Sequence, residues 1–195
     1  MIWNPSDLCI DLAATGHQQS NKAIVDGLKR RRKSTGKVPY WIQMSGATLY
    51  AQDEIAKSHF GFSSQLILDD VKDQEAILQT IRSFPKRSVA NLAIEQSTEE
   101  IRTALIVGPL IYGDGKGPGN IRSIQAPEIA RATLELGHGF KLNAGENIWS
   151  NVHVADLGRL ISSLVKLAGQ GKDGIWNTDG VFHSAAGEMV CMFLS

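Results

Sequence analysis

The sequence is poor in cysteine, has no excess of charge of either sign and contains no long hydrophobic run. Its two cysteines, Cys9 and Cys191, lie near opposite ends and form no CxxC pair, which argues against a disulfide framework or a cysteine zinc site and indicates reduced, intracellular thiols. The 20 Lys and Arg balance the 20 Asp and Glu, so no global field would hold the chain on nucleic acid or an anionic membrane. No run approaches the roughly 18 apolar residues of a membrane span, and the N-terminus lacks the pattern of a secretory signal. We therefore expect a cytoplasmic protein.

The composition that remains is that of a folded globular chain. Its 195 residues are 43% hydrophobic and 21% charged, which is typical of a packed domain and too apolar for a disordered one. The length fits one domain. The five histidines show no ligand spacing, so we expect no metal site.

Apolar runs and helical periodicity alternate along the chain. The long stretch 47–70 has no clean period, and loops of that length are usually functional or disordered. Alternating strands and helices predict an α/β fold with a parallel sheet, and such sheets bind ligands outside the carboxyl ends of their strands. Strands are expected at 8–14, 39–45, 103–107, 148–154 and 174–178, and helices at 18–33, 73–83, 87–96, 121–137 and 155–168.

Four segments carry recognisable motifs. Residues 102–115 read RTALIVGPLIYGDG and residues 147–156 read NIWSNVHVAD, while DLCIDLAA at 7–14 and IQMSG at 42–46 precede them. In this order the segments resemble the NAD-dependent epimerase/dehydratase family, the extended and atypical short-chain dehydrogenases. The resemblance runs from about Asp7 to Thr178 and implies a Rossmann-type sheet, an NAD or NADP cofactor, a small-molecule substrate, and hydride transfer on a carbonyl or secondary alcohol.

The resemblance also implies that part of the family fold is missing. Residues 7–14 match the fourth strand of the family, so the first three strands are not in the sequence, and neither is the G-x-x-G-x-x-G turn that closes on the cofactor pyrophosphate. We expect a single incomplete domain over 1–195, with sheet and helices in about 1–112 and mainly a substrate-side region in about 113–195. The abrupt start and the tail at 189–195 suggest a truncated product or an imperfect gene model, and cofactor binding should be weak or absent.

A second departure concerns catalysis. The family chemistry usually needs Tyr-x-x-x-Lys on a helix, because the Lys charge lowers the pKa of the phenol that shuttles the proton. The aligned positions are Arg87 and Asn91, and neither side chain titrates near neutral pH. Only Tyr112 to Lys116 fits the spacing, and its glycine-rich context predicts a turn, which makes the match accidental.

Two residues are candidates for catalysis. Ser45 follows the second expected strand, where the family serine hydrogen-bonds a substrate carbonyl or hydroxyl; alternatively, it ends the strand by bonding local backbone. Tyr50, five residues further on, is a candidate replacement for the lost phenol or, alternatively, a packing or surface aromatic. His153 and Asp156 could form an acid/base pair, but a strand end followed by an Asp helix cap is the favoured interpretation.

The resemblance places cofactor contacts after two strands. Small residues after the first strand would leave room for the cofactor, and the backbone after strand 103–107 would face the nicotinamide. Close packing of helices on the sheet explains the same residues equally well. The candidates are Ala13, Ala14, Thr15, Gly108 and Pro109.

By resemblance, the function is that of an NAD(P)-dependent epimerase/dehydratase-like oxidoreductase. The alternative is a non-catalytic remnant or ligand-binding pseudoenzyme, and a DNA-binding regulator is a more distant third. Loss of the central strands would leave strand 8–13 with an open edge that carries one charge, Asp11. Such an edge favours homodimer formation or other self-association.

Overall fold

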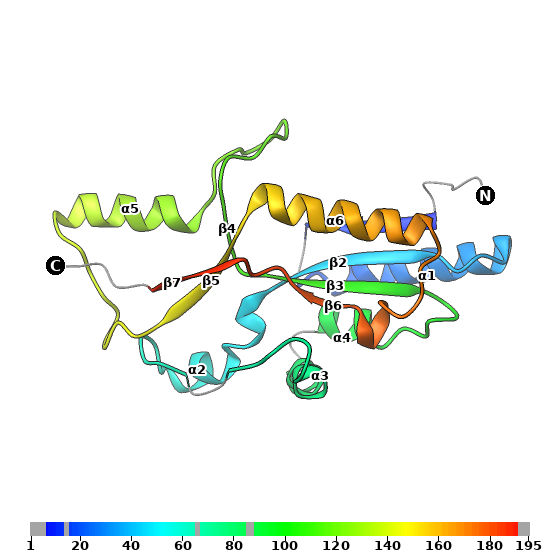
Figure 1. Ribbon diagram of the computed structural model, residues 1–195, viewed down its shortest axis with the longest axis horizontal. Helices are drawn as coiled ribbons and strands as arrows, with labels where there is room; N and C mark the ends of the chain where they lie inside the picture. Colours follow the sequence, from blue (N-terminus) through cyan, green and yellow to red (C-terminus); the bar gives the residue numbers. More distant parts are fainter. Residues whose placement is uncertain (1–6, 14–15, 65–66, 85–87, 191–195) are drawn as a thin grey trace.

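The main sheet of the protein has four parallel strands. The computed structural model describes residues 7–13, 16–64, 67–84 and 88–190. Within them, the strand order is β1-β2-β3-β6, and each neighbouring pair is parallel. The parallel sheet with its flanking helices confirms the predicted α/β class of Rossmann type (Figure 1). The strands are β1 (Leu8–Asp11), β2 (Tyr40–Gly46), β3 (Arg102–Gly108) and β6 (Val181–His183).

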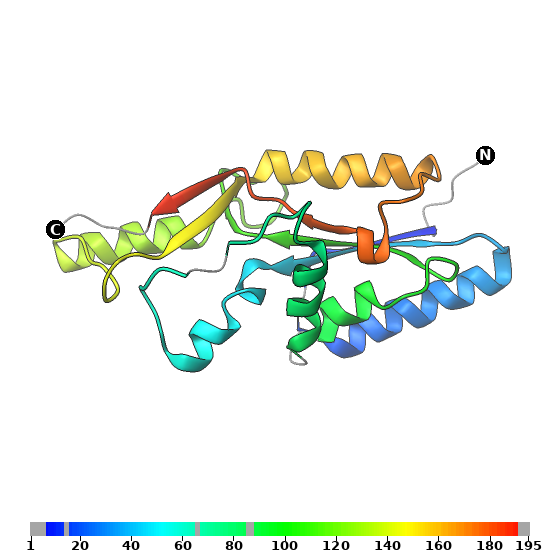
Figure 2. The ribbon, with the colours of Figure 1, turned by 60° about the horizontal axis from the view of Figure 1, so that its bottom comes forward.

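Helices cover both faces of this sheet because its central strands are apolar on both sides. Successive side chains of a strand point to opposite faces. Trp41 of β2 packs in one core cluster with Val25 and Ile77, and Ile42 packs in a second cluster with Leu164. Figure 2 shows the helices in two layers, one on each side of the main sheet. One face carries α1 (Gln18–Thr35), α3 (Gln74–Ser83) and α4 (Ser88–Ile94), and the other carries α6 (Val154–Gly169).

The ends of two helices follow from local chemistry. Helix α1 stops at Gly36, whose left-handed backbone (φ 71°) lets its N–H donate to the Arg32 carbonyl, as the glycine stop predicted. Helix α6 is capped by His153, whose Nδ1 accepts from the N–H of Ala155 at 3.1 Å. The predicted Asp156 cap is wrong because the helix begins at Val154, so Asp156 falls in the first turn and pairs with Arg159.

A second, smaller sheet lies on the side where β2 and β3 end (Figure 1). Its strands are ordered β4-β5-β7, with β4 parallel and β7 antiparallel to β5. The predicted division into a sheet part before about residue 112 and a substrate-side part after it stays a prediction. Two elements after residue 112 are part of the main layers: β6 is a strand of the main sheet, and α6 packs on that sheet. The remaining elements are β4 (Leu110–Tyr112), β5 (Ile148–His153), β7 (Gly187–Val190), α2 (Gln52–Lys57) and α5 (Gln125–Leu136).

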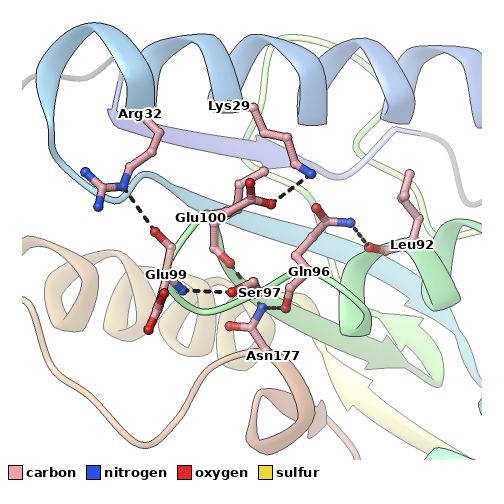
Figure 3. A network of polar contacts seen from close by, with 9 residues as sticks. Lys29, Arg32, Leu92, Gln96, Ser97, Glu99, Glu100 and Asn177 are labelled. Atoms are coloured by element: carbon pink, nitrogen blue, oxygen red, sulfur yellow. Dashed lines mark hydrogen bonds and ion pairs between the residues drawn. The ribbon is translucent and has the colours of Figure 1, made fainter.

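The strand predicted at 174–178 is wrong. A short 3-10 helix, η4 (Asn177–Asp179), occupies its end, and β6 follows as the last strand of the main sheet. Asn177 has a left-handed backbone (φ 62°). Its side-chain amide donates to the Gln96 carbonyl at 2.6 Å (Figure 3). It also donates to the Ile101 carbonyl at 3.1 Å. These bonds tie η4 to the connection between α4 and β3, where a sheet ladder had been expected.

Candidate functional site

Three residues of the main sheet form one row at the carboxyl ends of its strands. The register pairs Ser45 of β2 with Val107 of β3, and Val107 with His183 of β6. Residues paired in this way point to the same face of a sheet. Val107 belongs to the core cluster under α1, α3 and α4, so Ser45 and His183 share that face. At about 4.8 Å per strand, roughly 10 Å separates their backbones.

The turn after β2 brings Tyr50 back onto this row. Residues Ala47–Leu49 form a 3-10 helix, η2, in which Leu49 is fully buried and the N–H of Tyr50 donates to the Ala47 carbonyl at 3.0 Å. The Tyr50 phenol oxygen lies 2.5 Å from Nε2 of His183. The two rings are tilted by 36° with centroids 5.5 Å apart. Part of the segment predicted to be irregular therefore carries an aromatic side chain to the carboxyl end of β6.

An acidic residue lies behind the histidine. Oδ2 of Asp70 is 4.0 Å from Nδ1 of His183. The turn that holds Asp70 is fixed by its neighbour Asp69, whose carboxylate accepts from the N–H groups of Val71 and Lys72 at 3.0 and 2.9 Å. These backbone bonds lower the pKa of Asp69. The His183 ring therefore lies between the Tyr50 phenol and the Asp70 carboxylate.

Burial is the main influence on the pKa values of Tyr50 and His183. Burial, followed by the charge of Asp70, raises the pKa of the Tyr50 phenol well above its ordinary value. Burial lowers the pKa of His183, and the nearby Asp70 carboxylate only partly opposes that effect. At neutral pH the phenol is therefore protonated and the imidazole neutral. A neutral imidazole carries one proton, on Nδ1 or on Nε2, and this tautomer decides whether the phenol donates or accepts in its contact with Nε2.

Ser45 is a buried residue near the carboxyl end of β2. The residue is 6% exposed, and its side chain is on the face of the sheet that carries α1, α3 and α4. A hydroxyl at the carboxyl end of a parallel strand lies where ligands of such sheets bind.

The structure describes three of the five residues proposed to contact the cofactor. Ala14 and Thr15 lie outside the described residues. Ala13 follows β1 and is exposed, and its N–H donates to Oδ1 of Asp11 at 3.0 Å. A Cβ on Gly108 would lie 2.4 Å from Cε of Met44, so the small size of this glycine serves the packing of Met44. Pro109 joins β3 to β4.

The positions of the family Tyr-x-x-x-Lys motif hold no proton shuttle. Arg87 lies outside the described residues. Asn91 lies on α4, and its Oδ1 is buried with no hydrogen-bond partner among them. The literal match from Tyr112 to Lys116 is not helical, because β4 ends at Tyr112 and Gly113 has a φ of 94°. The prediction of a turn there is confirmed.

A dinucleotide needs polar partners near the sheet and a turn that holds its phosphates. Ser45 and the buried Oδ1 of Asn91 are polar groups near the sheet, but the sequence has no G-x-x-G-x-x-G turn for the phosphates. Two surface pockets lie elsewhere, one beside Pro127 and Leu134 of α5 and one beside Arg102 and Trp176. Neither is lined by Ser45, Tyr50 or His183.

Two further kinds of feature are absent from the described residues. Across 7–13, 16–64, 67–84 and 88–190, no group of three or more His, Cys, Asp or Glu side chains is placed to hold a metal ion. In the same ranges, no helix has the length and apolar character needed to cross a membrane.

The sequence predicted Ser45 and Tyr50, which stay predictions, and gave no role to His183 or Asp70, which the structure places beside Tyr50. Tyr50 and His183 are 133 positions apart, and no motif connects them. A signal was present in the apolar pair Val181 and Phe182 directly before His183, which indicates a short buried strand that ends in a titratable residue.

Comparisons with known proteins give one sequence relative and several similar folds. No family model matches the sequence. The chain is 28% identical over 178 residues to oxidase ucsJ from Acremonium sp., a match that covers 89% of the chain and 50% of that protein. The chain thus spans half the length of this curated relative.

Two solved structures have similar folds at low sequence identity. One is MoeE5 in complex with UDP-glucuronic acid and NAD, with a TM-score of 0.49, 15% identity, and coverage of 95% of this chain and 58% of that one. The other is RMD from Pseudomonas aeruginosa complexed with NADPH, with a TM-score of 0.48, 16% identity, and coverage of 97% and 64%. In its four motif segments and its parallel sheet, the chain resembles the NAD-dependent epimerase/dehydratase family.

Proposed function

We propose that the chain is the substrate-side part of an NAD(P)-dependent oxidoreductase that acts on a carbonyl or a secondary alcohol. One observation carries the proposal: the strand and turn from Tyr40 to Tyr50 bring the buried Ser45 hydroxyl and the Tyr50 phenol to the carboxyl ends of parallel strands. Ligands of such sheets bind at these ends. The name of the sequence relative, an oxidase, agrees with a redox reaction.

The two side chains have complementary roles in this proposal. The Ser45 hydroxyl donates a hydrogen bond to the substrate oxygen and polarises the carbonyl. Tyr50, which keeps its proton at neutral pH, gives that proton to the oxygen as the carbonyl becomes an alcohol. The nicotinamide, when bound, supplies or takes up the hydride.

A second candidate function is a ligand-binding protein without catalysis. It is favoured by the missing phosphate turn and by Asn91 at the position of the family lysine. In that case the hydroxyl of Ser45 would contact a ligand but no bond would change. Turnover separates the two candidates.

The experiment uses the protein at its full natural length, with NAD(H) or NADP(H) and a panel of aldehydes, ketones and secondary alcohols. Ser45→Ala should lower turnover about 100- to 1,000-fold, the usual effect of losing a donor to a developing oxyanion. Ser162→Ala, an exposed serine on α6, is the matched control and should keep full activity. Absence of turnover in the unaltered protein, or full activity in Ser45→Ala, would reject these roles.

A further inference from the structure

We propose that His183 and Asp70 form a proton relay behind Tyr50, in place of the lysine that the sequence lacks. The proposal deepens the proposed function and rests on it. His183 acts through Tyr50 and Asp70 acts through His183, so both are positioning residues, whereas Tyr50 contacts the substrate. Neither residue belongs to the motifs that carry the family resemblance.

The three side chains lie in order from the strand ends toward solvent. The Tyr50 phenol oxygen lies 2.5 Å from Nε2 of His183, and Nδ1 of the same ring lies 4.0 Å from Oδ2 of Asp70. Exposure increases along this path: the side chain of His183 is 21% exposed and that of Asp70 is 55% exposed. A proton that leaves the buried phenol can therefore reach water without crossing the core.

The second observation is an imidazole nitrogen that lacks a hydrogen bond. Nδ1 of His183 is buried and has no hydrogen-bond partner in the described part of the chain. Buried polar atoms are normally paired. A small closing movement of Asp70, or an intervening water, would pair this nitrogen when the ring becomes positively charged.

The surroundings of Tyr50 explain why such a relay is needed. A neighbouring lysine would favour the phenolate, but burial and Asp70 favour the phenol here. A protonated phenol can take a proton from an alcohol only if its own proton has somewhere to go. In the relay that place is Nε2 of His183, 2.5 Å from the phenol oxygen, with the proton of the neutral ring on Nδ1.

The steps balance in both directions. During oxidation the alcohol O–H bond breaks and its proton goes to the Tyr50 oxygen, while the Tyr50 proton goes to Nε2 of His183. The electron pair of the C–H bond leaves as hydride, which a nicotinamide bound at the strand ends would accept. The resulting imidazolium faces the Asp70 carboxylate and loses a proton to water. Reduction is the reverse, with a proton entering through His183.

The first test needs no cofactor. In nitrogen-15 NMR of the unliganded chain, with signals assigned by His183→Gln, the neutral His183 ring should carry its proton on Nδ1 and titrate below the ordinary histidine range. Of the described charged groups, Asp70 acts on both Tyr50 and His183. Asp70→Asn should therefore lower the pKa of His183 further, and Tyr50→Phe should raise it, because the donor to the neutral ring is lost.

The control for this test is Asp53→Asn, which removes an exposed carboxylate from α2 and should leave the His183 titration unchanged. An Asp70→Asn protein with an unchanged His183 pKa would overturn the relay. So would a neutral ring that carries its proton on Nε2.

The second test uses turnover of alcohols by the full-length protein. His183→Gln should lower kcat for oxidation about 100-fold with little change in KM, and should remove the rise of kcat with pH that His183 governs. Asp70→Asn should lower kcat less and shift that rise to lower pH. An active, Ser45-dependent protein with full kcat in His183→Gln would overturn the relay alone. A protein with no hydride transfer at all would overturn the proposed function and the relay together.

Discussion

At the scale of single residues, Asn177 combines a left-handed backbone with a side chain whose amide oxygen and nitrogen both form hydrogen bonds. It is 3% exposed, and its amide bonds the backbone at Gln96, Ile101 and Thr103. Asparagine adopts this backbone more readily than other residues with a side chain. Its amide thereby holds η4 against the connection between α4 and β3.

We expect substitutions of Asn177 to separate these two effects. Asn177→Gly keeps the backbone accessible and loses the amide, which should lower the free energy of unfolding by about 2–3 kcal/mol, at about 1 kcal/mol per hydrogen bond. Asn177→Ala should lose about 1 kcal/mol more, because alanine resists the left-handed backbone. Urea denaturation measures both, with the exposed Asn120→Ala as control. A glycine variant as stable as the unaltered chain would contradict this role.

At the scale of elements, β1 forms an open edge of the main sheet. No strand pairs with its outer side within the described residues. Next to this edge, Ile10 is 41% and Leu12 53% exposed, and Asp11 is the one charge between Leu8 and Leu12. An apolar edge with unpaired backbone groups is a template for pairing with another chain.

The predicted result is self-association of the isolated chain through β1. Sedimentation should show dimers or larger species, and Ile10→Lys should shift the distribution toward monomer, because a charged side chain disfavours edge pairing. Leu134→Lys on α5, where the leucine is 82% exposed, tests whether any new lysine has this effect. A monodisperse monomer with a sharp thermal transition would show that the edge is covered in another way.

At the scale of the whole molecule, the expected strength of cofactor binding depends on a motif that the sequence does not contain. The groups available lie along the carboxyl ends of the strands, and the sequence lacks the glycine-rich turn that holds a pyrophosphate. Phosphate binding at such a turn depends on backbone N–H groups at a helix N-terminus. Without it, most of the binding energy of the cofactor has no source.

We therefore expect the 195-residue chain to bind NADH and NADPH weakly or not at all. Fluorescence or calorimetric titration measures this, with buffer matched to the protein dialysate as the baseline. A micromolar dissociation constant, about −8 kcal/mol, would show that residues outside the recognised motifs hold the cofactor.

The sequence by itself determined the features that depend on neighbouring residues. Alternating apolar strands and periodic helices predicted a parallel sheet, the glycine at position 36 predicted the end of α1, and glycines predicted the turn after Tyr112. Local sterics and periodicity are written in consecutive residues. The positions of Ser45 and Tyr50 as candidates also came from their place after a strand.

Only the tertiary structure decided which distant groups meet. The contact between Tyr50 and His183 spans 133 positions, and it depends on β6 pairing with β3. The same holds for β7, which pairs with β5, and for Asn177, whose bonds to the α4–β3 connection replace a strand. Pairing between remote segments is settled by packing of the whole chain, because no local pattern records the partner.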